Sequence, residues 1–254
     1  MFFSRQRGQN RILMRNNCMD FKMRTPFRRI IPFCPLCGAL TSQVVCDECA
    51  EELDKELVFD SASAYCGGLG YRMTFASLYH GLMREAINEY KFKCRKSLSE
   101  YFAGLVRAFA FGKAQGEHCG GDPNEVLFLF APSSRQGMRM RGFNQVEQAL
   151  LRSGLDYCRV FSVKDSGRHM AQQKELTKSE RLRQSRDKYE ADERELICHL
   201  EDKRRIVIVD DIWTTGSTML SMISLAHGIL MRNHMESISV EGLVFARAKD
   251  MLAF

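Results

Sequence analysis

The sequence lacks several patterns by which common protein classes are recognised. Its 254 residues contain no apolar run close to the ~18 residues of a membrane span, so no membrane span is expected. No G-x-x-x-x-G-K-[ST] motif is present, which argues against a P-loop nucleotide site, and no G-x-G-x-x-G follows a strand pattern, which argues against a dinucleotide fingerprint. The histidines are isolated from one another and show no catalytic or metal-ligand spacing.

The excess of positive charge is concentrated at the start of the chain. The whole chain has a net charge of +6, yet residues 1–30 alone hold eight basic residues and one acidic residue. This segment lacks the apolar core of a secretory signal, so export is not implied. Two interpretations stay open: a disordered basic arm that contacts polyanions, or a start assigned too early, because Met14, Met19 and Met23 follow within it.

Four of the ten cysteines form a metal-binding pattern. Cys34 and Cys37 make one C-x-x-C pair, and Cys46 and Cys49 make another after eight intervening residues. Such pairs supply the four thiolates of a tetrahedral structural zinc site. Disulfides are the alternative, but this spacing in a chain without a secretory signal favours a metal. We therefore predict a small zinc ribbon over residues 31–60, and we interpret the six other cysteines as ordinary reduced thiols.

A second pattern combines an apolar run, two acids and a hydroxyl-rich loop. The β-branched run Ile206–Val209 predicts a buried strand that ends on Asp210 and Asp211. A helical apolar pattern follows from Met219 to Leu230. The N-terminus of such a helix offers unpaired N–H groups and partial positive charge to an anion. The predicted phosphate-binding residues between strand and helix are Thr214, Thr215, Gly216, Ser217 and Thr218.

These residues resemble the phosphoribosyl-pyrophosphate motif of the type I phosphoribosyltransferases. The resemblance implies that Asp210 and Asp211 bind the ribose hydroxyls and that the loop holds the 5′-phosphate. An ordinary buried strand followed by an N-capped helix is the alternative. Two neighbouring acids and five consecutive small or hydroxyl residues favour the functional interpretation.

Helix and strand patterns alternate along most of the remaining chain. Helices are expected at 51–57, 78–90, 98–111 and 144–151, strands at 126–130, 159–163 and 238–245, a loop at 112–124 and a polar excursion at 164–189. This order predicts one α/β domain over residues 61–254, with a mostly parallel twisted sheet flanked by helices. Ligands of such sheets bind beyond the carboxyl ends of the strands.

A basic segment follows the strand expected at 126–130. It carries two serines and three arginines without an acid among them: Ser133, Ser134, Arg135, Arg139 and Arg141. Guanidinium groups suit phosphate oxygens because they can donate two parallel hydrogen bonds. An exposed basic loop that contacts nothing is the alternative. The segment is expected at the same sheet edge as the phosphate loop, so we predict that it binds pyrophosphate or DNA.

The order of these motifs resembles the ComF family. The match runs from the four cysteines through Lys91-Phe92-Lys93, Arg141-Gly-Phe-Asn-Gln145 and Gln172-Gln173 to the Asp-Asp motif. The resemblance implies a type I phosphoribosyltransferase-like domain behind the zinc ribbon, in a cytoplasmic bacterial protein. It also implies a mobile flap over residues 172–186, Mg²⁺ bound with phosphoribosyl pyrophosphate, and partner proteins of the DNA-uptake machinery.

Two functions are compatible with these features. The first is a ComF-like protein that binds phosphoribosyl pyrophosphate or a related ligand and handles single-stranded DNA during natural transformation. The second is an active phosphoribosyltransferase that moves ribose 5-phosphate to a base or to ammonia and releases pyrophosphate. The sequence names no acceptor for such a reaction.

Overall fold

A computed structural model describes residues 33–66, 69–112, 122–164 and 188–248. The basic arm, most of the loop expected at 112–124, and the flap expected over 172–186 lie outside these residues. The described helices are α1 Asp47–Lys55, α2 Gly81–Lys91, α3 Ser99–Ala110, α4 Arg135–Arg141, α5 Gln145–Ser153, α7 Glu193–Cys198 and α8 Ser217–Arg232. The described strands are β1 Leu57–Cys66, β2 Leu69–Leu78, β3 Val126–Phe130, β4 Phe161–Val163, β5 Tyr189–Ala191, β6 Arg205–Trp213 and β7 Ser239–Arg247.

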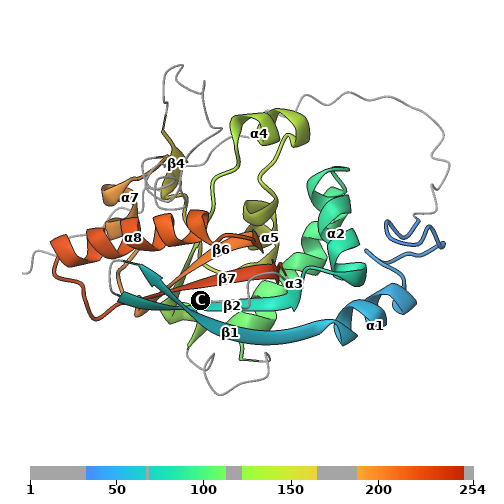
Figure 1. Ribbon diagram of the computed structural model, residues 1–254, viewed down its shortest axis with the longest axis horizontal. Coiled ribbons are helices and arrows are strands. Elements are labelled where there is room, and N and C mark those ends of the chain that lie inside the picture. The colour runs from blue at the N-terminus through green and yellow to red at the C-terminus, as the bar shows by residue number, and fades with distance from the viewer. Residues whose placement is uncertain (1–32, 67–68, 113–121, 165–187, 249–254) are drawn as a thin grey trace, which may run out of the picture. The chain divides into compact units, whose positions relative to one another are not determined.

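A five-stranded, mostly parallel sheet forms the centre, in the order β1-β2-β7-β6-β3 (Figure 1). β2, β7, β6 and β3 run parallel to their neighbours, and β1 pairs antiparallel with β2 at one edge. The register pairs Phe130 with Val209 and Asp210 with Val244. The carboxyl ends of these three strands therefore meet at one edge of the sheet, as the expected mixed α/β architecture requires.

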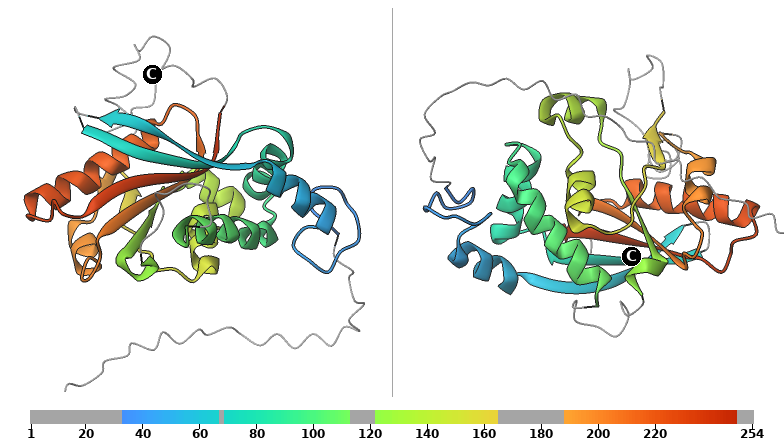
Figure 2. Two further views of the ribbon diagram at one scale, coloured as in Figure 1. Left: turned by 90° about the horizontal axis from the view of Figure 1, so that it is seen from below. Right: turned by 180° about the vertical axis from the view of Figure 1, so that it is seen from behind.

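Each face of the sheet is covered by helices, and each carries its own apolar cluster. Val207 and Val209 of β6 pack on the side of α2, α3 and α5. Ile206 and Ile208 pack on the opposite side, with α8 and α7. Figure 2 shows α8 and α3 on opposite sides of the sheet. This two-sided burial explains why β6 has a continuous apolar run instead of an alternating one.

The structure contains a hairpin that the sequence pattern did not indicate. β1 and β2 fill residues 57–78, where no strand was expected. β1 is rich in small and polar residues, so its pattern is weak, while Tyr71, Met73 and Phe75 of β2 alternate toward one buried cluster. Residues 57–60, expected within the zinc module, belong to this sheet. Leu78, expected to begin a helix, instead ends β2, and α2 begins at Gly81.

Other boundaries differ by a few residues. The helix expected at 51–57 is α1 and begins earlier, at Asp47, directly after Cys46. The strand expected to end at Val209 continues to Trp213, so both aspartates lie within β6. The basic segment after β3 is the short helix α4, which Ser134 caps by accepting a hydrogen bond from the Gly137 N–H. Tertiary pairing extends β6 because β7 continues beside it up to Arg247.

The ends of the polar excursion meet. β4 and β5 form a separate antiparallel pair in which Val163 lies opposite Tyr189. The chain therefore leaves and returns at one place, as expected for a stretch outside the sheet. Among the described residues, none of the helices has both the length and the apolar character needed to cross a membrane.

Candidate functional site

A pocket lies at the carboxyl end of β6. It is lined by Asp210, the turn residues 214–216, the first residues of α8 and Val244 of the neighbouring strand. Helix α8 has 16 residues and no acidic side chain in its first turn. Its first N–H groups and the hydroxyls of Thr214, Thr215 and Ser217 thus surround a space suited to an anion.

Gly216 is required by the shape of this turn. Its φ is +72°, in the left-handed region, and it is the N-cap of α8. A Cβ atom at this position would lie 2.6 Å from Nε1 of Trp213. Both the backbone conformation and the indole therefore exclude a side chain, which leaves the turn open to a ligand. Trp213 itself is buried.

The two aspartates point to opposite faces of the sheet. Consecutive strand residues alternate in direction. Asp210 lines the pocket beside α8, whereas Asp211 contacts residues of α2 and α5 on the other face. The sequence places the two acids side by side, and the pleat of β6 separates their side chains.

Asp211 is the centre of a buried polar network. Its Oδ2 lies 2.6 Å from Nζ of Lys91 and accepts a 2.7 Å hydrogen bond from Nε2 of Gln145. Oε1 of Gln145 accepts a 3.4 Å hydrogen bond from the Ser133 hydroxyl, which in turn accepts a 3.2 Å bond from Arg141. Asp211 is 6% exposed, so the lysine offsets a charge that burial would otherwise disfavour. The network joins the basic segment to β6.

The surroundings of Asp210 raise its pKa. Burial and the neighbouring charge of Asp211 raise the pKa of Asp210 to about 7. One Oδ atom of Asp210 accepts a 2.8 Å hydrogen bond from the Asp211 N–H, which opposes the rise in pKa. At neutral pH this carboxyl group is therefore partly protonated. A ligand cation would favour the ionised form.

The three arginines of the basic segment do not act as one cluster. Arg135 and Arg139 are exposed on α4, whereas Arg141 is half-buried and directed inward. Arg141 donates to the Ser133 hydroxyl and to the Lys91 carbonyl, the latter at 3.4 Å. Its Nε is buried and has no hydrogen-bond partner among the described residues. Of the predicted residues, Ser133 and Arg141 are thus connected to Asp211 through Gln145, and Arg135 and Arg139 are exposed.

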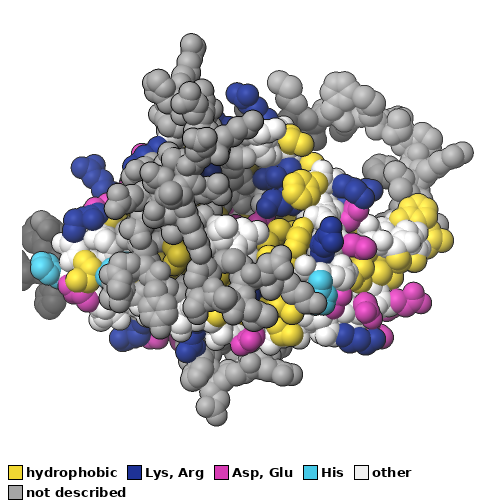
Figure 3. Space-filling model, in the orientation of Figure 1, with side chains coloured by type: hydrophobic (Ala, Val, Ile, Leu, Met, Phe, Trp, Pro, Cys, Tyr) yellow, Lys and Arg dark blue, Asp and Glu magenta, His cyan; other side chains and the backbone are white. Residues whose placement is uncertain are grey.

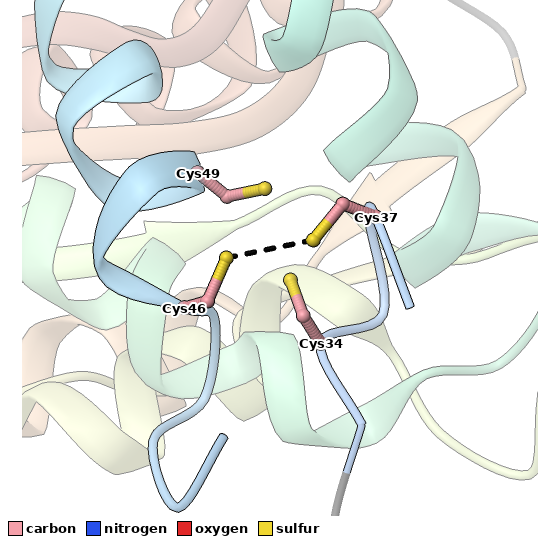
Figure 4. Close-up of side chains that lie close together, drawn as sticks. All are labelled: Cys34, Cys37, Cys46 and Cys49. Atoms are coloured by element: carbon pink, nitrogen blue, oxygen red, sulfur yellow. Dashed lines mark hydrogen bonds between the residues drawn. The ribbon is translucent and has the colours of Figure 1, made fainter. Parts of the chain in front are cut away.

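The four cysteines of the predicted metal site converge. Their sulfur atoms lie within 4.8 Å of one another and point toward a common centre (Figure 4). The sulfur atoms of Cys37 and Cys46 lie 3.5 Å apart. Cys34, Cys46 and Cys49 are buried, and Cys37 is exposed. Four such thiols could bind a structural metal such as zinc.

Local backbone donors prepare this cluster for a cation. Burial tends to raise the pKa of Cys34, but hydrogen bonds from the backbone of Cys46, Cys37 and Leu36 outweigh it and lower the pKa to about 6. The Cys49 thiol has a pKa well above its ordinary value because of burial and the other sulfur atoms. One thiolate is thus available at neutral pH, and a metal is needed to hold the full set deprotonated.

Glu56 links the segment that carries the four cysteines to the polar network around Asp211, here called the β6 site. It follows α1, and its two carboxylate oxygens each accept a 2.8 Å hydrogen bond, from the N–H groups of Leu82 and Met83. It therefore caps the start of α2, the helix whose last residue is Lys91. The sequence motifs identified Lys91 and Gln145 only as parts of a family resemblance. Their contact with Asp211 is long-range and was not predicted.

Comparison of the chain with protein-family models and with curated proteins gives no match.

Proposed function

We propose that this protein binds a phosphorylated ribose, with phosphoribosyl pyrophosphate as the ligand. The observation that carries the proposal is the pocket that combines Asp210 with the open N-terminus of α8. The turn from Thr214 to Thr218 would hold the 5′-phosphate, and Asp210 would accept hydrogen bonds from the ribose diol. The type I phosphoribosyltransferase-like fold belongs to this proposal, because the mixed sheet alone is compatible with it and with other α/β folds.

The pyrophosphate would lie on the other side of β6. The side chains of Ser133 and Arg141 would supply hydrogen-bond donors there, and the Lys91 ammonium group would supply positive charge. Mg²⁺ bound with the ligand would supply positive charge near Asp210 and would favour the ionised form of its carboxyl group. The two aspartates would then have separate roles: Asp210 contacts the ligand, and Asp211 holds Lys91 and Gln145 in position.

Calorimetric titration with Mg²⁺ and phosphoribosyl pyrophosphate tests this assignment. Asp210→Asn combined with Asp211→Asn should weaken binding at least tenfold, or about 1.4 kcal/mol, because the charge beside the diol is lost and Lys91 and Gln145 are no longer held in position. Asp202→Asn is a matched control: it is exposed on the turn before β6, at the opposite end of the strand. Unchanged affinity in the double variant would rule out the site.

Turnover is a separate question from binding. An active phosphoribosyltransferase would position the donor and stabilise an oxocarbenium-like transition state by charge. Pyrophosphate release from phosphoribosyl pyrophosphate, measured across a panel of bases and ammonia, distinguishes an enzyme from a binding protein.

A second candidate function is the binding of single-stranded DNA, in a ComF-like role in DNA uptake. The favouring observation is a surface, here called the α2–α4 surface, that consists of the exposed residues Phe92, Lys93, Arg95, Arg139 and Met140. Phe92 is 60% exposed, and Met140 is 66% exposed. The Cys94 thiol lies 3.7 Å from the Met140 carbonyl oxygen, so the two segments adjoin. Figure 3 shows hydrophobic side chains beside Lys and Arg side chains in this region. An exposed ring among cations suits stacked bases and phosphates.

Salt dependence of binding to a homopolymeric single strand tests this function. Removing Arg139 should reduce the log–log salt slope by roughly 0.7 if it contacts a phosphate. Phe92→Ala should weaken binding without changing the slope, because stacking releases no counterions. Arg204→Ala, at the amino end of β6, is the matched control, since Arg204 is exposed and pairs with Glu125. If both test variants bind like the parent, the α2–α4 surface has no such role.

The cysteine cluster completes the proposal as a structural zinc site. Zinc in small modules of this kind contributes on the order of 10 kcal/mol to folding. Metal analysis of protein purified without chelators should give at least one zinc per chain. A value well below one would overturn this assignment.

A further inference from the structure

A second group of metal-ligating side chains lies at the end of α7. Glu195, Cys198 and His199 offer a carboxylate, a thiol and an imidazole whose ligand atoms all lie within 4.8 Å of one another. Their i, i+3 and i+4 spacing places them on one side of the helix. The spacing of the histidines from one another did not indicate this group, because its His199 lies beside a cysteine and a glutamate.

The distances between the donor atoms are close to, but not yet those of, a tetrahedral metal site. The Cys198 sulfur lies 3.2 Å from Nδ1 of His199 and 3.2 Å from the main-chain oxygen of Glu195. Nδ1 of His199 lies 2.9 Å from that oxygen and 3.8 Å from the Glu195 carboxylate. Tetrahedral zinc, with bonds of about 2.0–2.3 Å, requires donors roughly 3.3–3.7 Å apart. The four distances lie between 2.9 and 3.8 Å, so a tetrahedral metal would require each of them to change by a few tenths of an ångström.

The frame that carries these donors is well anchored. Leu196 and Leu200 are buried in the apolar cluster on the face of the sheet that α8 covers. The Asp192 carboxylate caps the start of α7 by accepting a hydrogen bond from the Glu195 N–H. Cys198 and His199 nevertheless remain exposed and Glu195 half-exposed, so a cation can reach them from solvent. The helix is fixed by its apolar side, and its ligands face outward.

We propose that Glu195, Cys198 and His199 form a second metal site, specific for borderline divalent cations such as zinc, cobalt or copper. Sulfur and imidazole donors disfavour Mg²⁺ and Ca²⁺, which prefer oxygen ligands. Three side chains leave the fourth position to the Glu195 carbonyl or to water, so this site is more open than the four-cysteine cluster and exchanges its metal more readily. It packs on the opposite face of the sheet from the four-cysteine cluster.

Cobalt titration of the full-length, metal-free protein tests the proposal. Co²⁺ reports thiolate ligands through a charge-transfer band and tetrahedral geometry through its visible bands. The parent should bind a second equivalent with a weaker charge-transfer band, as expected for one thiolate. Cys198→Ser should remove that band, and His199→Gln should weaken the second equivalent at least tenfold.

Cys94→Ser is the matched control, because Cys94 is also exposed but belongs to no group of metal-ligating side chains within the described part of the chain. Its titration should match that of the parent. Thermal melts of all variants should coincide, since the substituted side chains are on the surface. A second equivalent whose thiolate band survives Cys198→Ser, or the absence of any second equivalent in the parent, would overturn the proposal.

Discussion

The four-cysteine cluster and the β6 site are assembled over different distances along the chain. All four cysteines lie between residues 34 and 49, and the start of α1 places the last two. The β6 site instead joins Lys91 of α2, Gln145 of α5 and Asp211 of β6. Short-range spacing alone can therefore specify a metal cluster, whereas the polar network requires three separately folded elements to pack together.

The largest expected effect separates the two regions. Removing metal with a strong chelator, or replacing Cys49 by Ser, should unfold residues 33–56, because metal binding supplies on the order of 10 kcal/mol there. Hydrogen exchange should rise over α1 and at the first turn of α2, where Glu56 is the cap. The amides of β6 and β7 should keep their protection. Loss of protection throughout the sheet would show that the two regions are one cooperative unit.

The Lys91–Asp211 pair provides the next largest effect. Lys91→Met leaves a buried carboxylate without its cation, so we expect a loss of about 2–3 kcal/mol in the free energy of unfolding. The Lys91→Met, Asp211→Asn double variant should recover part of that loss, because no buried charge remains. Urea denaturation measures both values. Equal stability of the single and double variants would mean that Lys91 does not compensate Asp211.

Two glycine substitutions should change the free energy of unfolding in opposite directions. Gly216→Ala forces a side chain into a left-handed turn against Trp213, at a cost of about 1–2 kcal/mol. Gly104→Ala lies within α3 with open space around the added Cβ, and should stabilise the protein by about 0.5–1 kcal/mol. Urea midpoints compare the two. A neutral Gly216→Ala variant would show that the turn is not rigid.

The last predicted effect is a pH dependence that comes from the protonation of Asp210. Its folded-state pKa of about 7 exceeds the unfolded value, so the folded protein binds the proton more tightly between about pH 4 and pH 7. The free energy of unfolding should therefore fall as pH rises through that window. Asp210→Asn removes the titration, so its stability relative to the parent should increase from low to high pH.

Chemical denaturation at several pH values measures this difference, with Asp202→Asn as the control. Asp210→Asn should bind phosphoribosyl pyrophosphate less tightly than the parent does, although it should be more stable than the parent at pH 8. A pH-independent difference between Asp210→Asn and the parent would place the raised pKa on another group.

Local patterns predicted several elements well. The strand over Val126–Phe130 was predicted with both ends correct, and the convergence of the four cysteines was confirmed. The β1–β2 hairpin was missed because small and polar residues give β1 no clear alternation. The end of β6 was placed too early because two acids resemble a strand boundary, while pairing with β7 carries the strand through them. The roles of the phosphate loop and of the basic segment stay predictions.

The sequence by itself determined the contents of both regions: two C-x-x-C pairs, two adjacent acids, and a glycine-containing turn before a helix. Those features depend on residue type and near-neighbour spacing, which a linear pattern records. Only the tertiary structure decided that Asp210 faces the pocket and Asp211 faces Lys91, and that Arg141 is directed inward while Arg139 is exposed. The physical reason is that pleating sends neighbouring side chains to opposite faces, and the helices packed on each face then set their charge partners.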